Sequence, residues 1–175
     1  MIGDVLTLFK TLLDIVRLQK GPEAIPHSPV LFVLMVAAWM AVGAVVTAMI
    51  GELNQSDFAI SMLLGVIALV IYAAAIVFSQ KSTRVLQSLT AILGCGVLLE
   101  CLFVTGYLSL SPILGKDIAG LASYLILLWS VPVEGHIIAR AIDRHWYVGF
   151  LIAMAVFLIQ IQVSTSLGPT DLATP

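Results

Sequence analysis

The sequence predicts an all-α membrane protein: a polytopic bundle of five transmembrane helices, preceded by an N-terminal amphipathic helix at the membrane interface. Of its 175 residues, 61% are apolar and only 10% are charged, whereas a soluble domain carries about 25% charged residues. Five apolar stretches reach the roughly 20 residues that crossing the hydrocarbon core of a bilayer requires. This composition excludes a soluble enzyme, a nucleic-acid-binding domain and a disordered regulator.

Residues 1–20 have the periodicity of an amphipathic helix. Its apolar face carries Ile2, Val5, Leu6, Phe9, Leu12, Leu13 and Val16, and its polar face carries Asp4, Thr7, Lys10, Thr11, Asp14 and Arg17. Beside a membrane span, such a helix is expected to lie in the cytoplasmic interface, and a docking face for a partner helix is the alternative. The predicted contacts with lipid or partner are Phe9, Lys10, Leu13 and Arg17.

The five predicted spans form one transmembrane domain over residues 30–163, and a Pro-rich lead, residues 21–29, connects the first helix to it. The spans cover residues 30–50, 58–78, 85–108, 118–139 and 145–163. The connections between them are short, which predicts antiparallel neighbours and leaves no room for another domain. The polar residues 164–175 are expected to form a disordered extracytoplasmic tail.

The basic residues predict the orientation of the bundle, because cytoplasmic loops are enriched in Lys and Arg. Seven of the eight fall on one side of the predicted spans, and Lys116 alone falls on the other. The seven are Lys10, Arg17, Lys20, Lys81, Arg84, Arg140 and Arg144. We therefore expect a cytoplasmic N-terminus and an extracytoplasmic C-terminus, with the bacterial inner membrane as the location.

Glu100 is the first candidate for a functional intramembrane group. It lies slightly past the middle of the third span, where an unpaired carboxylate is strongly disfavoured. Gln160 and Tyr124 fall at a similar depth in the fifth and fourth spans. One interpretation is a proton or cation site. The other, which the lack of a second acid at this depth favours, is an interhelical hydrogen bond from a neutral carboxyl group to Gln160 or Tyr124.

A second polar cluster is predicted on the cytoplasmic side of the bundle, from Glu134, His136, Tyr72 and Arg140. Pro132 should kink the fourth span near this cluster, and a hydrogen bond from Glu134 to Tyr72 or to Gln87 is expected. At about 1.5 Å per residue, Glu134 and Glu100 should differ in depth by roughly 13 Å.

The loop that follows this cluster, with Arg140, Asp143, Arg144, His145, Trp146 and Tyr147, is interpreted as basic anchors and an aromatic belt. Recognition of an anionic lipid headgroup is the alternative.

Small residues at spacings of four predict faces for helix packing. They are Gly43, Thr47 and Gly51 in the first span, and Gly149 and Ala153 in the fifth. No catalytic set, phosphate-binding Gly-rich loop or group of metal ligands is recognisable, so neither an enzymatic activity nor a cofactor nor a metal is predicted, and no nucleic-acid partner is expected. Cys95 and Cys101 point about 120° apart on one helix and cannot form a disulfide there.

A cytoplasmic amphipathic helix, a Pro-containing lead from Gly21-Pro22 to Pro29 and five compact spans resemble the architecture of the Yip1-domain family of small membrane proteins. The resemblance covers residues 1–163 and transfers no functional residue, since no residue string matches. We expect an integral membrane scaffold or accessory subunit that contacts lipids and either a membrane-protein partner or a second copy of itself. The alternatives are a small proton- or ion-coupled transporter subunit that uses Glu100, and a lipid-interacting protein.

Overall fold

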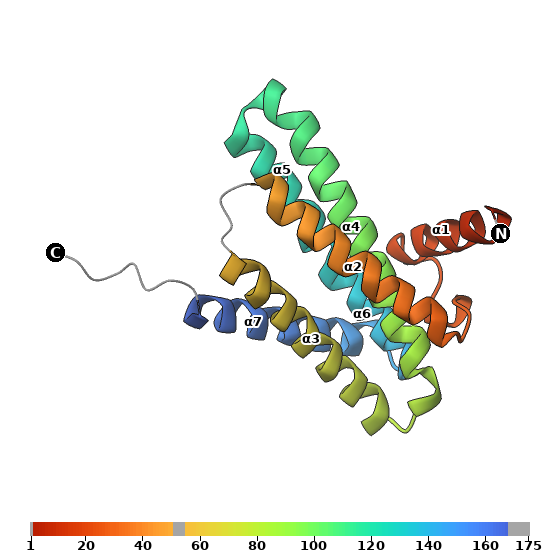
Figure 1. Ribbon diagram of the computed structural model, residues 1–175. Helices are drawn as coiled ribbons and strands as arrows, with labels where there is room; N and C mark the ends of the chain where they lie inside the picture. The colour runs from red at the N-terminus through yellow and green to blue at the C-terminus, as the bar shows by residue number, and fades with distance from the viewer. Residues whose placement is uncertain (1, 51–54, 168–175) are drawn as a thin grey trace.

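The computed structural model describes residues 2–50 and 55–167, and this part of the chain is helical without strands (Figure 1). Five of its helical segments are long and apolar enough to cross a membrane. They are Pro29–Val46, Phe58–Phe78, Ser82–Leu114, Lys116–Ala141 and Trp146–Ser166. The predicted all-helical class with five spans is confirmed.

The helices differ from the predicted spans mainly at their ends. They are α1 (Ile2–Val16), α2 (Pro29–Ile50), α3 (Gln55–Phe78), α4 (Val85–Leu114), α5 (Lys116–Leu128), α6 (Ser130–Ala141) and α7 (Trp146–Leu167), with short 3-10 helices at Pro22–Ala24 and Ser82–Arg84. α4 continues beyond the predicted end at residue 108, and Gly115 alone separates it from α5. Gly115 has φ 81°, which glycine adopts without strain. α7 likewise includes residues 164–167 of the expected tail, and residues 168–175 lie outside the described part.

α4 is the centre of the fold and contacts α1, α2, α3, α5 and α6. Its buried residues lie between Ser88 and Leu99, in the half of the helix that begins at Val85. Beyond this core, Figure 1 shows two helix pairs that diverge, α4 with α5 and α3 with α7. Glu100 stands directly after Leu99, the last buried residue of α4.

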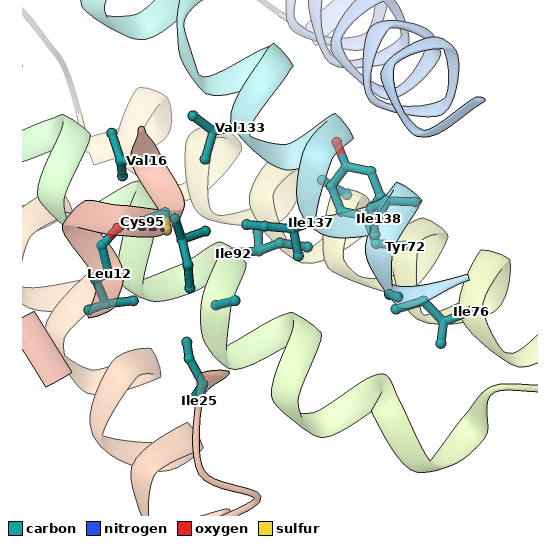
Figure 2. Packing of buried hydrophobic residues seen from close by; sticks show 14 of the residues in the cluster. Leu12, Val16, Ile25, Tyr72, Ile76, Ile92, Cys95, Val133, Ile137 and Ile138 are labelled. Carbon is teal, nitrogen blue, oxygen red and sulfur yellow. Dashed lines mark hydrogen bonds between the residues drawn. The ribbon is translucent and has the colours of Figure 1, made fainter. Parts of the chain in front are cut away.

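The last turns of α1 belong to the core. Leu12, Ile15 and Val16 are buried in the core cluster, where α1 contacts α4 and α6, and Figure 2 shows Leu12 beside Cys95, whose thiol lies 3.9 Å from the Leu12 carbonyl oxygen. The predicted helix over residues 1–20 ends earlier, at Val16. The segment after it is also packed, because Ile25 is buried and its carbonyl oxygen accepts a hydrogen bond from Gln87 Nε2 at 2.9 Å.

The fourth span is interrupted at Trp129, which separates α5 from α6. Pro132 lies in the first turn of α6 and has no N–H to donate to the carbonyl group four residues earlier. The interruption thus lies one turn before the proline at which a kink is predicted. It also brings the Trp129 indole to α1, where Nε1 donates a hydrogen bond to the Val16 carbonyl oxygen at 3.0 Å.

α6 and α7 pack in close contact through small residues. A Cβ atom built on Gly135 would lie 2.7 Å from Phe150 Cα, and one built on Gly149 would lie 2.7 Å from Ala139 Cβ. Both distances are shorter than real contacts, so only glycine fits at these two positions. Ala153, one turn further along α7 from Gly149, is completely buried.

Three helices end with a non-glycine residue in the left-handed conformation: Leu18 with φ 62°, Gln80 with φ 60° and Asp143 with φ 52°. After each of them, the next N–H group bonds the carbonyl oxygen five residues earlier, as Lys81 does with Ile76 at 3.2 Å. This is the Schellman arrangement, in which glycine is the usual residue. None of these three positions is a glycine, so glycine positions in the sequence could not predict where α1, α3 and α6 end.

Candidate functional site: an intramembrane polar cavity

A cavity of about 330 Å³ lies among the five helical segments that are long and apolar enough to cross a membrane, and each of them contributes to its wall. Most of the wall is apolar. The polar lining residues are Ser61, Tyr72, Glu100, Ser130, Glu134 and Gln160, and Trp39 and Phe157 are aromatic neighbours. A cavity of this size is within the range of small-ligand sites, which combine an apolar wall with few polar groups.

Glu100 lines the cavity from α4, and its Oε2 atom is buried with no hydrogen-bond partner among the described residues. Neither of the two expected hydrogen bonds is present there. Gln160 also lines the cavity, but its Nε2 donates to the Leu64 carbonyl oxygen at 3.4 Å. Tyr124 is 67% exposed on α5 and is not part of the wall. A buried acceptor without a donor is costly, so this oxygen is free to accept a proton, a cation or a donor group from a ligand.

Glu134 lines the same cavity from α6 and is held by Tyr72 of α3. The Tyr72 hydroxyl donates a hydrogen bond to Glu134 Oε2 at 2.5 Å, and the tyrosine side chain is almost completely buried. Of the two hydrogen-bond partners predicted for Glu134, Tyr72 forms the bond. Gln87 instead donates to the Ile25 carbonyl oxygen.

The cavity brings together two acids that the sequence analysis assigned to separate sites. Counting depth along each span separated Glu100 from Glu134, but the wall of one cavity includes both. Ser61 and Trp39 were not predicted as lining residues, and nothing in the local sequence marks them. Ser130 and Glu134 are four residues apart in the sequence, which places them on one face of α6, and both line the cavity.

His136 and Arg140 do not join Glu134 and Tyr72, so the predicted cytoplasmic-side cluster divides into two groups. His136 Nε2 lies 3.1 Å from the Lys20 carbonyl oxygen. A carbonyl oxygen only accepts, so Nε2 carries the proton. Arg140 pairs with Glu23 at 2.7 Å. Both residues connect α6 to the segment that follows α1 rather than to the cavity.

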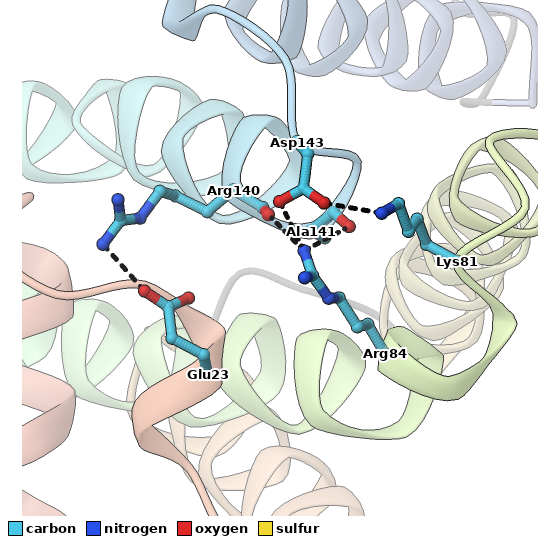
Figure 3. Close-up of polar contacts among 6 residues, drawn as sticks. All are labelled: Glu23, Lys81, Arg84, Arg140, Ala141 and Asp143. Atoms are coloured by element: carbon cyan, nitrogen blue, oxygen red, sulfur yellow. Dashed lines mark hydrogen bonds and ion pairs between the residues drawn. The ribbon is translucent and has the colours of Figure 1, made fainter.

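A network of charges closes the end of the bundle where α3 meets α4 and α6 meets α7 (Figure 3). Asp143 pairs with Lys81 at 2.7 Å and with Arg84 at 2.6 Å. Arg84 also donates to the carbonyl oxygens of Arg140 and Ala141, at 3.1 and 3.3 Å, and so satisfies the last turn of α6. Hydrogen bonds from Lys81 and then Arg84 lower the pKa of Asp143 to about 2, so the network stays ionised at neutral pH.

The remaining predicted residues do not line the cavity. Phe9 and Lys10 of α1 are exposed, Leu13 of α1 is half-buried, and Arg17, directly after α1, is exposed. Gly43 of α2 faces Met62 of α3, with 2.9 Å between a built Cβ atom and the Met62 Cε. The side chain of Thr47 and the whole of Gly51 lie outside the described part of the chain.

Within the described residues, no three His, Cys, Asp or Glu side chains form a group that could hold a metal ion. Searches with this chain found no matching family model, no matching curated protein and no matching solved structure.

Proposed function

We propose that this protein is a non-enzymatic integral membrane protein that binds protons or small cations in its intramembrane cavity, and that it acts as a subunit of a transporter. The observation that carries this proposal is Glu100 Oε2, which is buried beside the cavity without a partner among the described residues. An ionisable group within a span is costly and marks an ion or proton pathway in many membrane proteins. Glu100 is the proposed binding group.

The rest of the cavity wall supports this role. Glu134 supplies a second carboxyl group from another helix, and Tyr72 donates to it. Gln160 and Ser130 add polar atoms that replace part of the water shell of an ion. The described residues contain five helices that could span a membrane, an odd number that does not suit a simple inverted duplication among them. We therefore propose that transport requires a second copy of this chain.

Replacing Glu100 tests the proposal. In proteoliposomes of the full chain with an imposed pH gradient and defined Na⁺ and K⁺ concentrations, we expect the wild type to dissipate the gradient faster than protein-free vesicles. Glu100→Gln keeps the shape of the side chain but cannot ionise, so its rate should fall to the protein-free value. Asp117→Asn, at the exposed start of α5, removes an acid outside the cavity and should keep the wild-type rate. The proposal fails if the wild type does not exceed protein-free vesicles, or if Glu100→Gln matches the wild type.

α1 favours a second candidate, a scaffold or accessory subunit whose first helix contacts lipid or a partner. Its Val5, Leu6 and Phe9 side chains are 68%, 54% and 46% exposed, although α1 lies outside the five spans. An apolar helix face next to a membrane is stabilised by the bilayer interface. We propose on this ground that α1 is amphipathic and interfacial, on the cytoplasmic side of a bacterial inner membrane. The likeness to the Yip1-domain family belongs to this proposal and rests on architecture alone.

Purification in a mild detergent separates the two candidates. An accessory subunit should co-purify with a stoichiometric membrane-protein partner. The double variant Leu6→Ser/Phe9→Ser should release that partner, because it removes the apolar face that would bind it. The variant should still fold, because both side chains are exposed and contribute little to the fold. Gln19→Ser, at an exposed polar position just after α1, is the control and should retain it. Recovery of the wild type as a monomer or homodimer alone would count against the accessory role.

A further inference from the structure

A second pocket lies at the end of the bundle that carries the charge network, and the proposed transport function does not use it. Its volume is about 380 Å³, and its lining residues are Glu23, Arg84, Ala139, Arg140, Asp143 and Arg144. Three arginines thus surround one pocket. Guanidinium groups suit phosphate because their planar N–H groups form paired hydrogen bonds to its oxygens.

The network leaves this pocket with an excess of positive charge. Lys81, Arg84 and Arg140 are paired with Asp143 and Glu23. Arg144 has no side-chain partner among the described residues, yet it lines the same pocket. Its backbone N–H bonds the Ala139 carbonyl oxygen at 3.0 Å, which fixes where its side chain begins.

The acidic residues hold the arginines in place without using all their donors. Arg84 forms its hydrogen bonds through Nη1, and Arg140 bonds Glu23 through Nη2. A guanidinium group has five N–H donors, so each arginine keeps further donors for a ligand. The carbonyl oxygens of Arg140 and Ala141 already accept hydrogen bonds from Arg84. The negative end of the α6 dipole is therefore partly compensated beside the pocket.

The aromatic residues at the start of α7 place this pocket at the level of lipid headgroups. Trp146 and Tyr147 are 46% and 59% exposed and follow Arg144 closely. Trp146 stacks on Phe150 at 5.0 Å, and His145 stacks on Tyr147 at 5.6 Å. Amphipathic rings of this kind gather where the hydrocarbon meets water, and basic pockets between helices at this level bind phosphate headgroups.

We propose that this pocket binds a phosphate group, either in the headgroup of an anionic phospholipid or as soluble phosphate, through Arg84, Arg140 and Arg144. Arg84 and Arg140 are oriented by their acidic partners, and Arg144 supplies the uncompensated charge. The site is independent of Glu100, so a loss of binding here leaves the cavity intact.

The test measures binding of phosphatidylglycerol to the full chain in a neutral detergent, with phosphatidylcholine as the reference lipid and inorganic phosphate as the soluble probe. We expect phosphatidylglycerol to bind in preference to phosphatidylcholine. Arg144→Gln should weaken this binding by about tenfold, since it removes the uncompensated charge and a charge-assisted hydrogen bond to the phosphate. Arg144→Gln should also fold normally, because the side chain has no partner in the described structure.

Lys116→Gln is the control, because Lys116 is an exposed cation outside the pocket with no side-chain partner among the described residues. It should leave the affinity unchanged. Binding of inorganic phosphate with the same dependence on Arg144, without a preference for phosphatidylglycerol, supports the site with a soluble ligand. Equal losses in Arg144→Gln and Lys116→Gln would reveal diffuse surface attraction and overturn the proposal, as would the absence of binding to both probes.

Discussion

Gly135→Ala should push α6 away from α7 and strongly destabilise the protein. The added Cβ atom would lie 2.7 Å from Phe150 Cα and 2.9 Å from Phe150 N. Both are backbone atoms, so no side-chain rotation relieves the contact and α7 itself must move. Overpacking costs about 1–3 kcal/mol, and we expect the upper end of this range. The measurement is the free energy of unfolding in mixed micelles as the SDS fraction is raised.

Gly120→Ala is the matched control for this substitution. Gly120 is a helical glycine of α5 with nothing within 4 Å of a built Cβ atom. Alanine is favoured over glycine inside a helix by about 1 kcal/mol, so this variant should be as stable as the wild type or more stable. If both alanine variants behaved alike, the close contact between α6 and α7 would not contribute to stability.

Tyr72→Phe should destabilise the protein by about 1–3 kcal/mol, because it removes the hydroxyl that donates to Glu134 Oε2 at 2.5 Å and leaves a carboxyl group without this donor. The ring remains, so packing in the core is preserved. The same micellar unfolding measurement applies. Tyr124→Phe removes a hydroxyl from a 67% exposed side chain and should change the unfolding free energy by no more than about 0.5 kcal/mol.

A double-substitution cycle distinguishes the hydrogen bond from other effects of Tyr72. Replacing both partners of a buried hydrogen bond with apolar groups costs less than removing one. Tyr72→Phe should therefore destabilise the Glu134→Leu variant less than it destabilises the wild type. Equal effects in both backgrounds would mean that the Tyr72 hydroxyl contributes nothing through Glu134.

The hydrophobic runs were sufficient to predict the class and the number of spans, because each crossing needs about 20 apolar residues whatever its partners. The partners themselves were harder to predict. Glu134 and Tyr72 lie on separate spans, and matching their depths found the contact. Glu100 and Tyr124 also matched in depth, but the rotation of α5 turns Tyr124 outward. Depth is read from position along a span, whereas the facing direction depends on how neighbouring helices pack.

The role of the first helix was predicted only in part. Its periodicity marked Leu12 and Val16 as apolar, yet Ile15, outside the predicted apolar face, is completely buried. Residues of α4 and α6 cover it, and no local pattern reports such distant neighbours. The cavity had the same difficulty, since its wall combines side chains from every span.

The contacts of α1 and of the segment that follows it can form only late in synthesis. The Val16 carbonyl oxygen accepts a hydrogen bond from the indole of Trp129, which is 113 positions away in the chain. The Lys20 carbonyl oxygen is bonded by His136, which is 116 positions away. During synthesis the residues of α1 are made long before Trp129 and His136, so these two contacts cannot form until the chain has been made as far as α6. Docking of α1 is therefore complete only after most of the described chain has been synthesised.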